Sequence, residues 1–200
     1  DWNQVRPLIE RALAPLSEVD IRVYEPGAAP VPEKMHKASE IPRMTAGRAA
    51  LVELMNRYIA GLLDPTVTLL ELHKLMYFMQ EAGEKLKLNF SRGTYGPYAE
   101  NLRHVLRTVE GHLISGYLDG GDDPTKQLEL VPGAVKDAVE FLMDKKGTSE
   151  RFNRVADLVE GFEAPLGLEL LSTAHWICAR EGAPAGEIIP RFYSWGEHKK

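Results

Sequence analysis

The sequence has one cysteine in 200 residues, no apolar run near the roughly 18 residues that span a bilayer, and no surplus of positive charge. A single cysteine, Cys178, cannot form a disulfide within the chain, which excludes a disulfide-stabilised secreted domain. The first residues show no positive segment followed by an apolar one, so no signal peptide is expected. A formal net charge of −5 argues weakly against a protein that binds duplex DNA. Together these absences predict a folded cytoplasmic protein that does not contact a membrane.

Motifs of catalysis are also missing. The sequence has no Gly-rich loop followed by Lys and Ser or Thr, no dinucleotide-binding Gly-x-Gly-x-x-Gly, no His-Glu-x-x-His and no Gly-x-Ser-x-Gly. His175 and Cys178 lie three residues apart in a helical pattern, but no second pair accompanies them, and two ligands seldom hold zinc. We therefore expect no metal, no cofactor and no enzymatic activity. We interpret Cys178 as a buried thiol that packs as a small apolar side chain.

Negative charge is concentrated in one stretch. Residues 110–144 contain eight acids and two lysines, a net charge of −6, so the rest of the chain is almost neutral. Such a stretch repels phosphate but attracts any protein that presents a nucleic-acid groove. The alternative is a solubilising loop in which aspartates form turns.

Hydrophobic periodicity predicts a mainly helical chain with short strands. Thr68 and Glu71 have the spacing of a capping box and start a helix that is apolar on most of its circumference, which predicts a central helix. Gly96 indicates a tight turn, after which Pro97 suits the first position of a helix. We expect helices at 2–16, 45–63, 68–83, 97–110, 132–143, 149–162 and 166–180, and strands at 19–24, 85–92, 112–118 and 127–131.

The order of these elements predicts an α+β fold, mainly α with a small antiparallel sheet. Two helices, a strand, a third helix and a hairpin resemble a winged-helix core, here with additional C-terminal helices. In that fold the helix at 97–110 is the recognition helix, and Asn101, Arg103, His104 and Arg107 lie away from its apolar face. The alternative is a solvated face with an ion pair between Glu100 and Arg103.

The chain divides into three parts. One helix and one strand at 1–25 cannot form a sheet by themselves and indicate the end of a larger domain. Residues 26–44 contain Pro26, Pro30, Pro32 and Pro42 and little apolar surface, which indicates a semi-extended linker. The main domain is expected at 45–200.

Three segments carry a family resemblance: Lys74-Leu75-Met76-Tyr77-Phe78-Met79-Gln80-Glu81-Ala82-Gly83, Tyr95-Gly96-Pro97-Tyr98 and Glu110-Gly111-His112-Leu113-Ile114-Ser115-Gly116-Tyr117. Residues 45–200 resemble the C-terminal, toxin-binding region of DarG antitoxins and, more broadly, SocA-like (Panacea) antitoxin domains. The resemblance implies a protein partner, a DarT-like DNA ADP-ribosyltransferase toxin. It also implies that 1–25 is the C-terminal helix and strand of a macrodomain. The Gly-rich loops of a macrodomain are absent, so its hydrolase activity is not carried over.

The resulting hypothesis is a non-catalytic antitoxin domain that blocks the toxin by imitating single-stranded DNA. Acids replace phosphates and one tyrosine replaces a stacked base, while an α-helical face and the C-terminal aromatics are further candidates. The expected partner-binding residues are Tyr117, Asp119, Asp122, Asp123, Glu129, Arg103, His104 and Trp195. No stable nucleic-acid binding is expected. The alternative hypothesis is a winged-helix DNA-binding or autoregulatory domain that reads bases with Asn101, Arg103 and Arg107.

Overall fold

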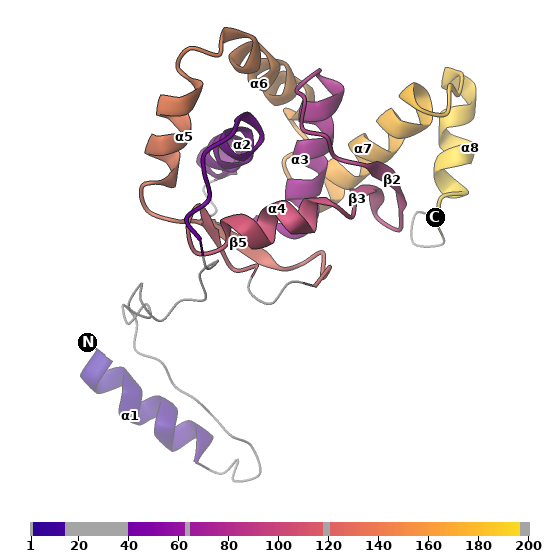
Figure 1. The fold of residues 1–200 in the computed structure, drawn as a ribbon. Helices are drawn as coiled ribbons and strands as arrows, with labels where there is room; N and C mark the ends of the chain where they lie inside the picture. Colours follow the sequence, from indigo (N-terminus) through magenta and orange to yellow (C-terminus); the bar gives the residue numbers. More distant parts are fainter. Residues whose placement is uncertain (1, 15–39, 63–64, 118–120, 197–200) are drawn as a thin grey trace. The chain divides into compact units, whose positions relative to one another are not determined.

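A computed structural model describes residues 2–14, 40–62, 65–117 and 121–196 (Figure 1). The chain separates into two compact units, residues 1–35 and 36–200. In the first unit, helix α1 (Trp2–Leu13) matches the predicted helix at 2–16. The strand predicted at 19–24 and most of the linker lie outside the described residues, so the three-part division stays a prediction. Nowhere in the described ranges is a helix long and apolar enough to cross a membrane.

The second unit is mainly helical with small antiparallel sheets, which confirms the predicted α+β class. The predicted helices at 45–63, 68–83, 132–143, 149–162 and 166–180 are all present within a few residues. Its elements are α2 (Ala46–Leu62), β1 (Val67–Thr68), α3 (Leu69–Glu81), β2 (Phe90–Gly93), β3 (Gly96–Ala99), α4 (Leu102–Val109), β4 (Ile114–Ser115), β5 (Gln127–Leu130), α5 (Ala134–Leu142), α6 (Lys146–Val159), α7 (Pro165–Ala179), the 3-10 helix η2 (Ala185–Glu187) and α8 (Ile188–Tyr193).

Helix α3 is the central helix, as predicted. The Thr68 hydroxyl accepts a hydrogen bond from the Glu71 amide (3.2 Å), and the Glu71 carboxylate accepts one from the Thr68 amide (2.8 Å). The same carboxylate also accepts a hydrogen bond from the Tyr58 hydroxyl of α2 (2.8 Å), which connects the two helices. Helices α2, α6 and α7 pack around α3 (Figure 1), so its side chains are buried almost all round.

The segment between α3 and α4 differs from the prediction. The expected strand at 85–92 is shortened to β2 because Lys87 has a φ of 60°, which breaks an extended backbone. The expected helix start at Pro97 is wrong: Pro97 lies in β3, opposite Arg92 of β2. A proline fits there because the hairpin is only two strands wide, so one side of β3 needs no donor. Helix α4 begins at Leu102 instead.

A second sheet contains three strands in the order β1-β5-β4, all antiparallel. The pairing of β4 with β5 confirms the predicted hairpin. Strand β1 is an addition that periodicity could not reveal, because two residues are too few to show alternation. In the register, Val67 faces Leu128 and Ile114 faces Leu130, and these side chains belong to the same apolar core as those of α3 and α4.

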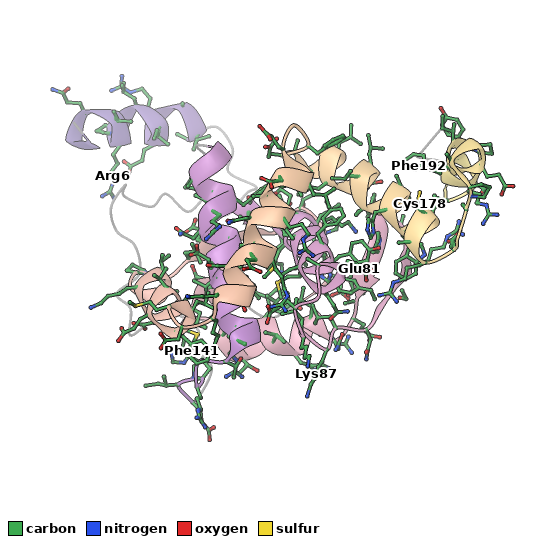
Figure 2. All side chains as sticks on the ribbon, turned by 90° about the horizontal axis from the view of Figure 1, so that it is seen from above. Arg6, Glu81, Lys87, Phe141, Cys178 and Phe192 are labelled. Atoms are coloured by element: carbon green, nitrogen blue, oxygen red, sulfur yellow. The ribbon has the colours of Figure 1, made fainter. Side chains whose placement is uncertain are left out.

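Cys178 is exposed on α7, so the prediction of a buried thiol is wrong. Figure 2 shows Cys178 and Phe192 where α7 and α8 meet, away from Glu81 of α3. His175, which the sequence analysis considered with Cys178 as a possible zinc ligand, instead forms a hydrogen bond through Nδ1 with the Tyr77 hydroxyl at 2.9 Å. Across the described residues, no group of three or more potential metal ligands is found.

Two glycines with positive φ, one packed against β5 and one in open space, allow a prediction about stability. Gly116 has a φ of 101°, and a Cβ there would lie 2.3 Å from the carbonyl oxygen of Gln127. Gly133 has a similar φ of 92°, but a Cβ there would have no neighbour within 4 Å. We expect Gly133→Ala to lower the free energy of unfolding by about 1–2 kcal/mol, the strain of the backbone alone. Gly116→Ala should lower it by roughly 1–3 kcal/mol more through the clash.

Urea denaturation of both variants measures this difference. Equal losses of stability in the two variants would show that the close approach of Gly116 to β5 is wrong.

Candidate functional site

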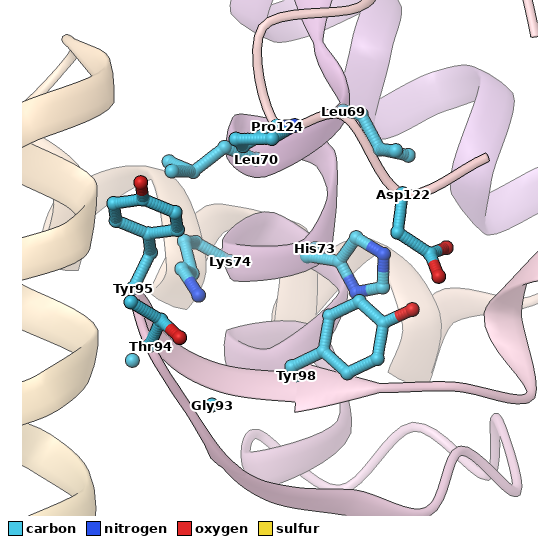
Figure 3. A pocket seen from close by; sticks show the side chains of 11 residues that line it. Leu69, Leu70, His73, Lys74, Gly93, Thr94, Tyr95, Tyr98, Asp122 and Pro124 are labelled. Atoms are coloured by element: carbon cyan, nitrogen blue, oxygen red, sulfur yellow. The ribbon is translucent and has the colours of Figure 1, made fainter.

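A cavity of about 360 Å³ lies beside the first two turns of α3. The hairpin β2–β3 forms one wall, and the turn that precedes β5 closes the top (Figure 3). Its volume is within the range of roughly 300–1,000 Å³ typical of small-molecule sites. The lining residues are Leu69, Leu70, His73, Lys74, Gly93, Thr94, Tyr95, Gly96, Tyr98, Asp122 and Pro124.

Two stacked rings form one side of the cavity. The rings of His73 and Tyr98 have centroids 4.6 Å apart and an interplanar angle of 22°. His73 is only 4% exposed, and burial, followed by the nearby charge of Lys74, lowers the pKa of His73 to about 3. The imidazole is therefore neutral near pH 7 and carries one N–H donor and one acceptor nitrogen. Its Nδ1 is buried and has no hydrogen-bond partner among the described residues.

Asp122 supplies a carboxylate next to this ring pair. Burial raises the pKa of Tyr98 above its usual range, and the hydrogen bond of its phenol to Asp122 raises it further. The phenol is therefore protonated and donates to the carboxylate. Asp122 itself is exposed and lines the cavity, so its carboxylate can accept further hydrogen bonds. The site thus combines a carboxylate acceptor, a neutral imidazole and an aromatic surface.

Lys74 holds the hairpin wall in place. It is fully buried, and its Nζ donates a hydrogen bond to the Pro97 carbonyl at 2.7 Å. Gly96 permits this approach, because a Cβ there would lie 2.8 Å from Thr173 Oγ1 of α7 and 3.4 Å from Lys74 Nζ. The hairpin therefore packs so closely on α3 and α7 that a side chain at position 96 would not fit. Tyr95 stands at the hairpin tip with 43% of its surface exposed.

The C-terminal element supports the same hairpin from outside. The Trp195 indole donates to the Gly93 carbonyl at 2.7 Å, and the Arg92 guanidinium lies 4.3 Å from the centre of the indole ring. Arg92 also donates to the Ser194 carbonyl at 3.2 Å. Trp195 is only 8% exposed, because its side chain packs against β2.

The acidic stretch at 110–144 does not present all of its acids to a partner. Glu110 is buried and accepts hydrogen bonds from the amides of Gly116 and Tyr117, both at 3.1 Å. Asp123 accepts from the amide and hydroxyl of Thr125, which makes it a turn former. Tyr117 is 1% exposed and packs under Lys126, so its ring is not available as a base-like contact.

Four other residues were expected to bind the partner. Glu129 is exposed on β5, and Asp119 lies outside the described residues. Arg103 forms an ion pair with Glu100 at 2.8 Å, which agrees with the alternative of a solvated face on α4. His104 is exposed on the same helix. Binding of a toxin to these residues stays a prediction.

The sequence did not predict a functional role for His73 and Tyr98, the two stacked rings of the cavity. His73 lies in the middle of the apolar run of α3, and a histidine at a core position was a usable signal. Tyr98 falls within the helix predicted at 97–110, whereas α4 begins at Leu102, five residues later than expected. Asp122 was predicted to bind a protein partner as a phosphate mimic, and not to line this cavity.

Comparison with known proteins gives relatives over almost the entire sequence, although no family profile matches it. A protein of Thermus aquaticus is 42% identical over 199 residues, which are 99% of this chain and 54% of the relative. A protein of Mycobacterium tuberculosis is 35% identical over 198 residues, 92% of this chain and again 54% of the relative. Both are named DNA ADP-ribosyl glycohydrolase. The chain thus spans about half the length of the curated relatives it matches.

These names correct the functional predictions. The aligned relatives carry the name of an enzyme, a glycohydrolase, and not that of a DarG C-terminal antitoxin domain. The assignment as a non-catalytic antitoxin that imitates single-stranded DNA is therefore wrong, and so is the alternative of a DNA-binding regulator. The expectation of no enzymatic activity is overturned by the same finding. The burial of Tyr117 gives a physical reason against its use as a stacked base.

Burial of His73 generates a pH prediction. Unfolded His73 takes up a proton below its ordinary pKa of 6.5, whereas folded His73 stays neutral until about pH 3. The unfolded state then binds more protons, so stability falls as the pH is lowered from 7 to 5. We expect His73 to account for about 2 kcal/mol of that fall.

Urea titrations at pH 7 and pH 5 measure this contribution in the wild type and in His73→Phe, which keeps a stacked ring. The variant should lose less stability on acidification, while His104→Phe on the exposed face of α4 should keep the wild-type loss. An identical pH dependence in His73→Phe and the wild type would contradict a buried neutral imidazole.

Proposed function

We propose that this chain is part of a DNA ADP-ribosyl glycohydrolase, in which the cavity beside α3 binds the ADP-ribosyl group. The observation that carries the proposal is the 42% identity, over 99% of the chain, to a protein with that name. The reaction adds water across the glycosidic bond, so that DNA regains its hydrogen and free ADP-ribose leaves. The cavity gives a place for a nucleotide-sized part of that group.

The residues of the cavity support binding better than bond cleavage. Hydrolysis of a glycosidic bond usually employs two carboxylates, one as acid and one as base or nucleophile. Among the residues that line the cavity, Asp122 is the one carboxylate. Aromatic and apolar side chains dominate the rest of the lining, as in sites that hold a ligand by shape. We therefore assign to this cavity the recognition of the substrate.

We also propose that residues 46–130 form a winged-helix-like core. The order α2, β1, α3, α4, β4, β5 and the sheet order β1-β5-β4 support this arrangement. The hairpin β2–β3 is inserted between α3 and α4, where it forms the wall of the cavity. The insertion would thus turn a common helix-and-sheet core into a binding site.

Binding to two single-stranded oligonucleotides tests the proposed function. They have the same sequence, and one bears an ADP-ribosyl group. We expect the chain to bind the modified strand about tenfold more tightly, because only that strand carries the ADP-ribosyl group that we assign to the cavity. Fluorescence anisotropy measures both affinities, and chromatography of the same mixtures measures any released ADP-ribose.

A pair of tyrosine variants locates the binding. Tyr95→Ala at the cavity rim should reduce the preference by about fivefold, corresponding to ~1 kcal/mol for one lost ring contact. Tyr193→Ala removes an exposed tyrosine on α8 that does not line the cavity and should leave the preference intact. Equal affinity for both strands, together with no release of ADP-ribose, would contradict the proposed function.

A further inference from the structure

We infer that a second cavity, at the start of α2 and α6, binds a phosphate group, with Lys85, Lys145 and Arg151 as the cations that contact it. This cavity has a volume of about 380 Å³ and shares no lining residue with the cavity beside α3. It lies between Ala46 of α2, the segment that follows α3 and the first turns of α6. The charges of this cavity alone carry the assignment, so it is independent of the proposed function.

Three cations and one carboxylate line the second cavity. The carboxylate, Glu84, is 9% exposed and accepts hydrogen bonds from Arg151 (2.9 Å) and from the Thr148 hydroxyl (3.0 Å). Glu84 thus neutralises Arg151 and holds its guanidinium in place. Among the described residues, neither Lys85 nor Lys145 forms an ion pair. Two positive charges therefore remain without a negative partner, which favours an anionic ligand.

The lysines at the start of α6 oppose the usual preference of a helix N-terminus. The first amides of a helix have no partner within it and give this end a partial positive charge, so acids and neutral capping side chains are favoured there. In α6 the cap is Lys145, Lys146 follows, the first turn contains no acid and no side chain caps the helix. Asp144 precedes them, but it is exposed and does not line the cavity. A bound anion would offset the repulsion that this sequence creates.

The donors suit a phosphate better than a carboxylate. A phosphate presents oxygens in several directions, whereas the two oxygens of a carboxylate lie in one plane. The cations reach the cavity from different elements, because Lys85 follows α3 and Lys145 and Arg151 belong to the start of α6. The Arg151 side chain is 32% exposed, so some of its five N–H donors remain for a ligand. The Phe141 ring lies 4.9 Å from the Lys145 ammonium and orients it.

The same chemistry occurs in free phosphate, at the end of a nucleotide chain and in a nucleic-acid backbone. The first amides of α6 add backbone donors of the kind that bind phosphate at helix N-termini. The cavity is larger than a single phosphate, so a sugar attached to the phosphate can also enter.

Titration of the complete chain with sodium phosphate at constant pH 7 tests the site, with sodium chloride at the same ionic strength as the control. The backbone amide resonances in ¹H–¹⁵N spectra show where an ion binds. We expect phosphate to shift the amides of Lys85, Gly147 and Thr148 most, because these residues line the cavity. Equal shifts with chloride, or phosphate shifts centred on other residues, would overturn the site.

Three lysine variants test the role of the cations. Lys85→Gln removes an unpaired charge from an exposed position, so the fold should be kept and phosphate should bind about tenfold more weakly. Lys85→Arg keeps the charge and should keep most of the affinity. Lys136→Gln changes an exposed lysine of α5 that does not line the cavity, so the affinity should not change. The concentration dependence of the amide shifts gives each affinity, and thermal unfolding checks that each variant is folded.

Two unmodified single-stranded oligonucleotides of one sequence, with a 5′-phosphate or a 5′-hydroxyl, distinguish the sources of the phosphate. Tighter binding of the 5′-phosphorylated strand that Lys85→Gln removes would support a terminal phosphate. Equal binding of both strands that Lys85→Gln weakens would support a backbone phosphate, and binding of inorganic phosphate alone would support the free ion.

These outcomes are separate from those of the proposed function, because neither oligonucleotide carries ADP-ribose. If Lys85→Gln binds inorganic phosphate and both strands as tightly as the wild type, or if none of them binds to the wild type, the phosphate site is wrong. Either result would leave the preference for the ADP-ribosylated strand to be judged by its own experiment.

Discussion

The hydrogen bond from the buried Lys74 ammonium to the Pro97 carbonyl is the contact on which the rest of the site depends. A charge removed from water must be compensated by well-placed polar groups, so its partner cannot move far. This contact fixes β3 against α3, and β3 in turn places Tyr98 over His73. Gly96 makes the contact possible, because any larger residue would push the hairpin away from α7.

The cavity follows from this arrangement. The hairpin β2–β3 covers one side of α3 and lines the cavity beside the start of that helix. Trp195 braces the hairpin from the far side through Gly93 and Arg92. The residues that follow α8 thus support the same wall, which explains why Trp195 is buried although it lies near the end of the described residues.

The sequence predicts the helices well and the site poorly, for physical reasons. Helix α3 was found because its capping box and apolar periodicity are local signals. The hairpin β2–β3 was missed because its decisive contacts join residues 23 positions apart, Lys74 and Pro97, and because proline before an apolar helical pattern favours a helix start. The acidic stretch was read as one surface, although Glu110 is buried and Asp123 serves a turn. Charge counted along a chain does not reveal which side chains face solvent.

The central claim is that the cavity beside α3 binds the ADP-ribosyl group. Intermolecular nuclear Overhauser effects in the complex of the chain with free ADP-ribose test it most directly. We expect contacts from the protons of ADP-ribose to the ring protons of Tyr95 and Tyr98, which line the cavity. Contacts from ADP-ribose only to residues outside this lining would contradict the claim.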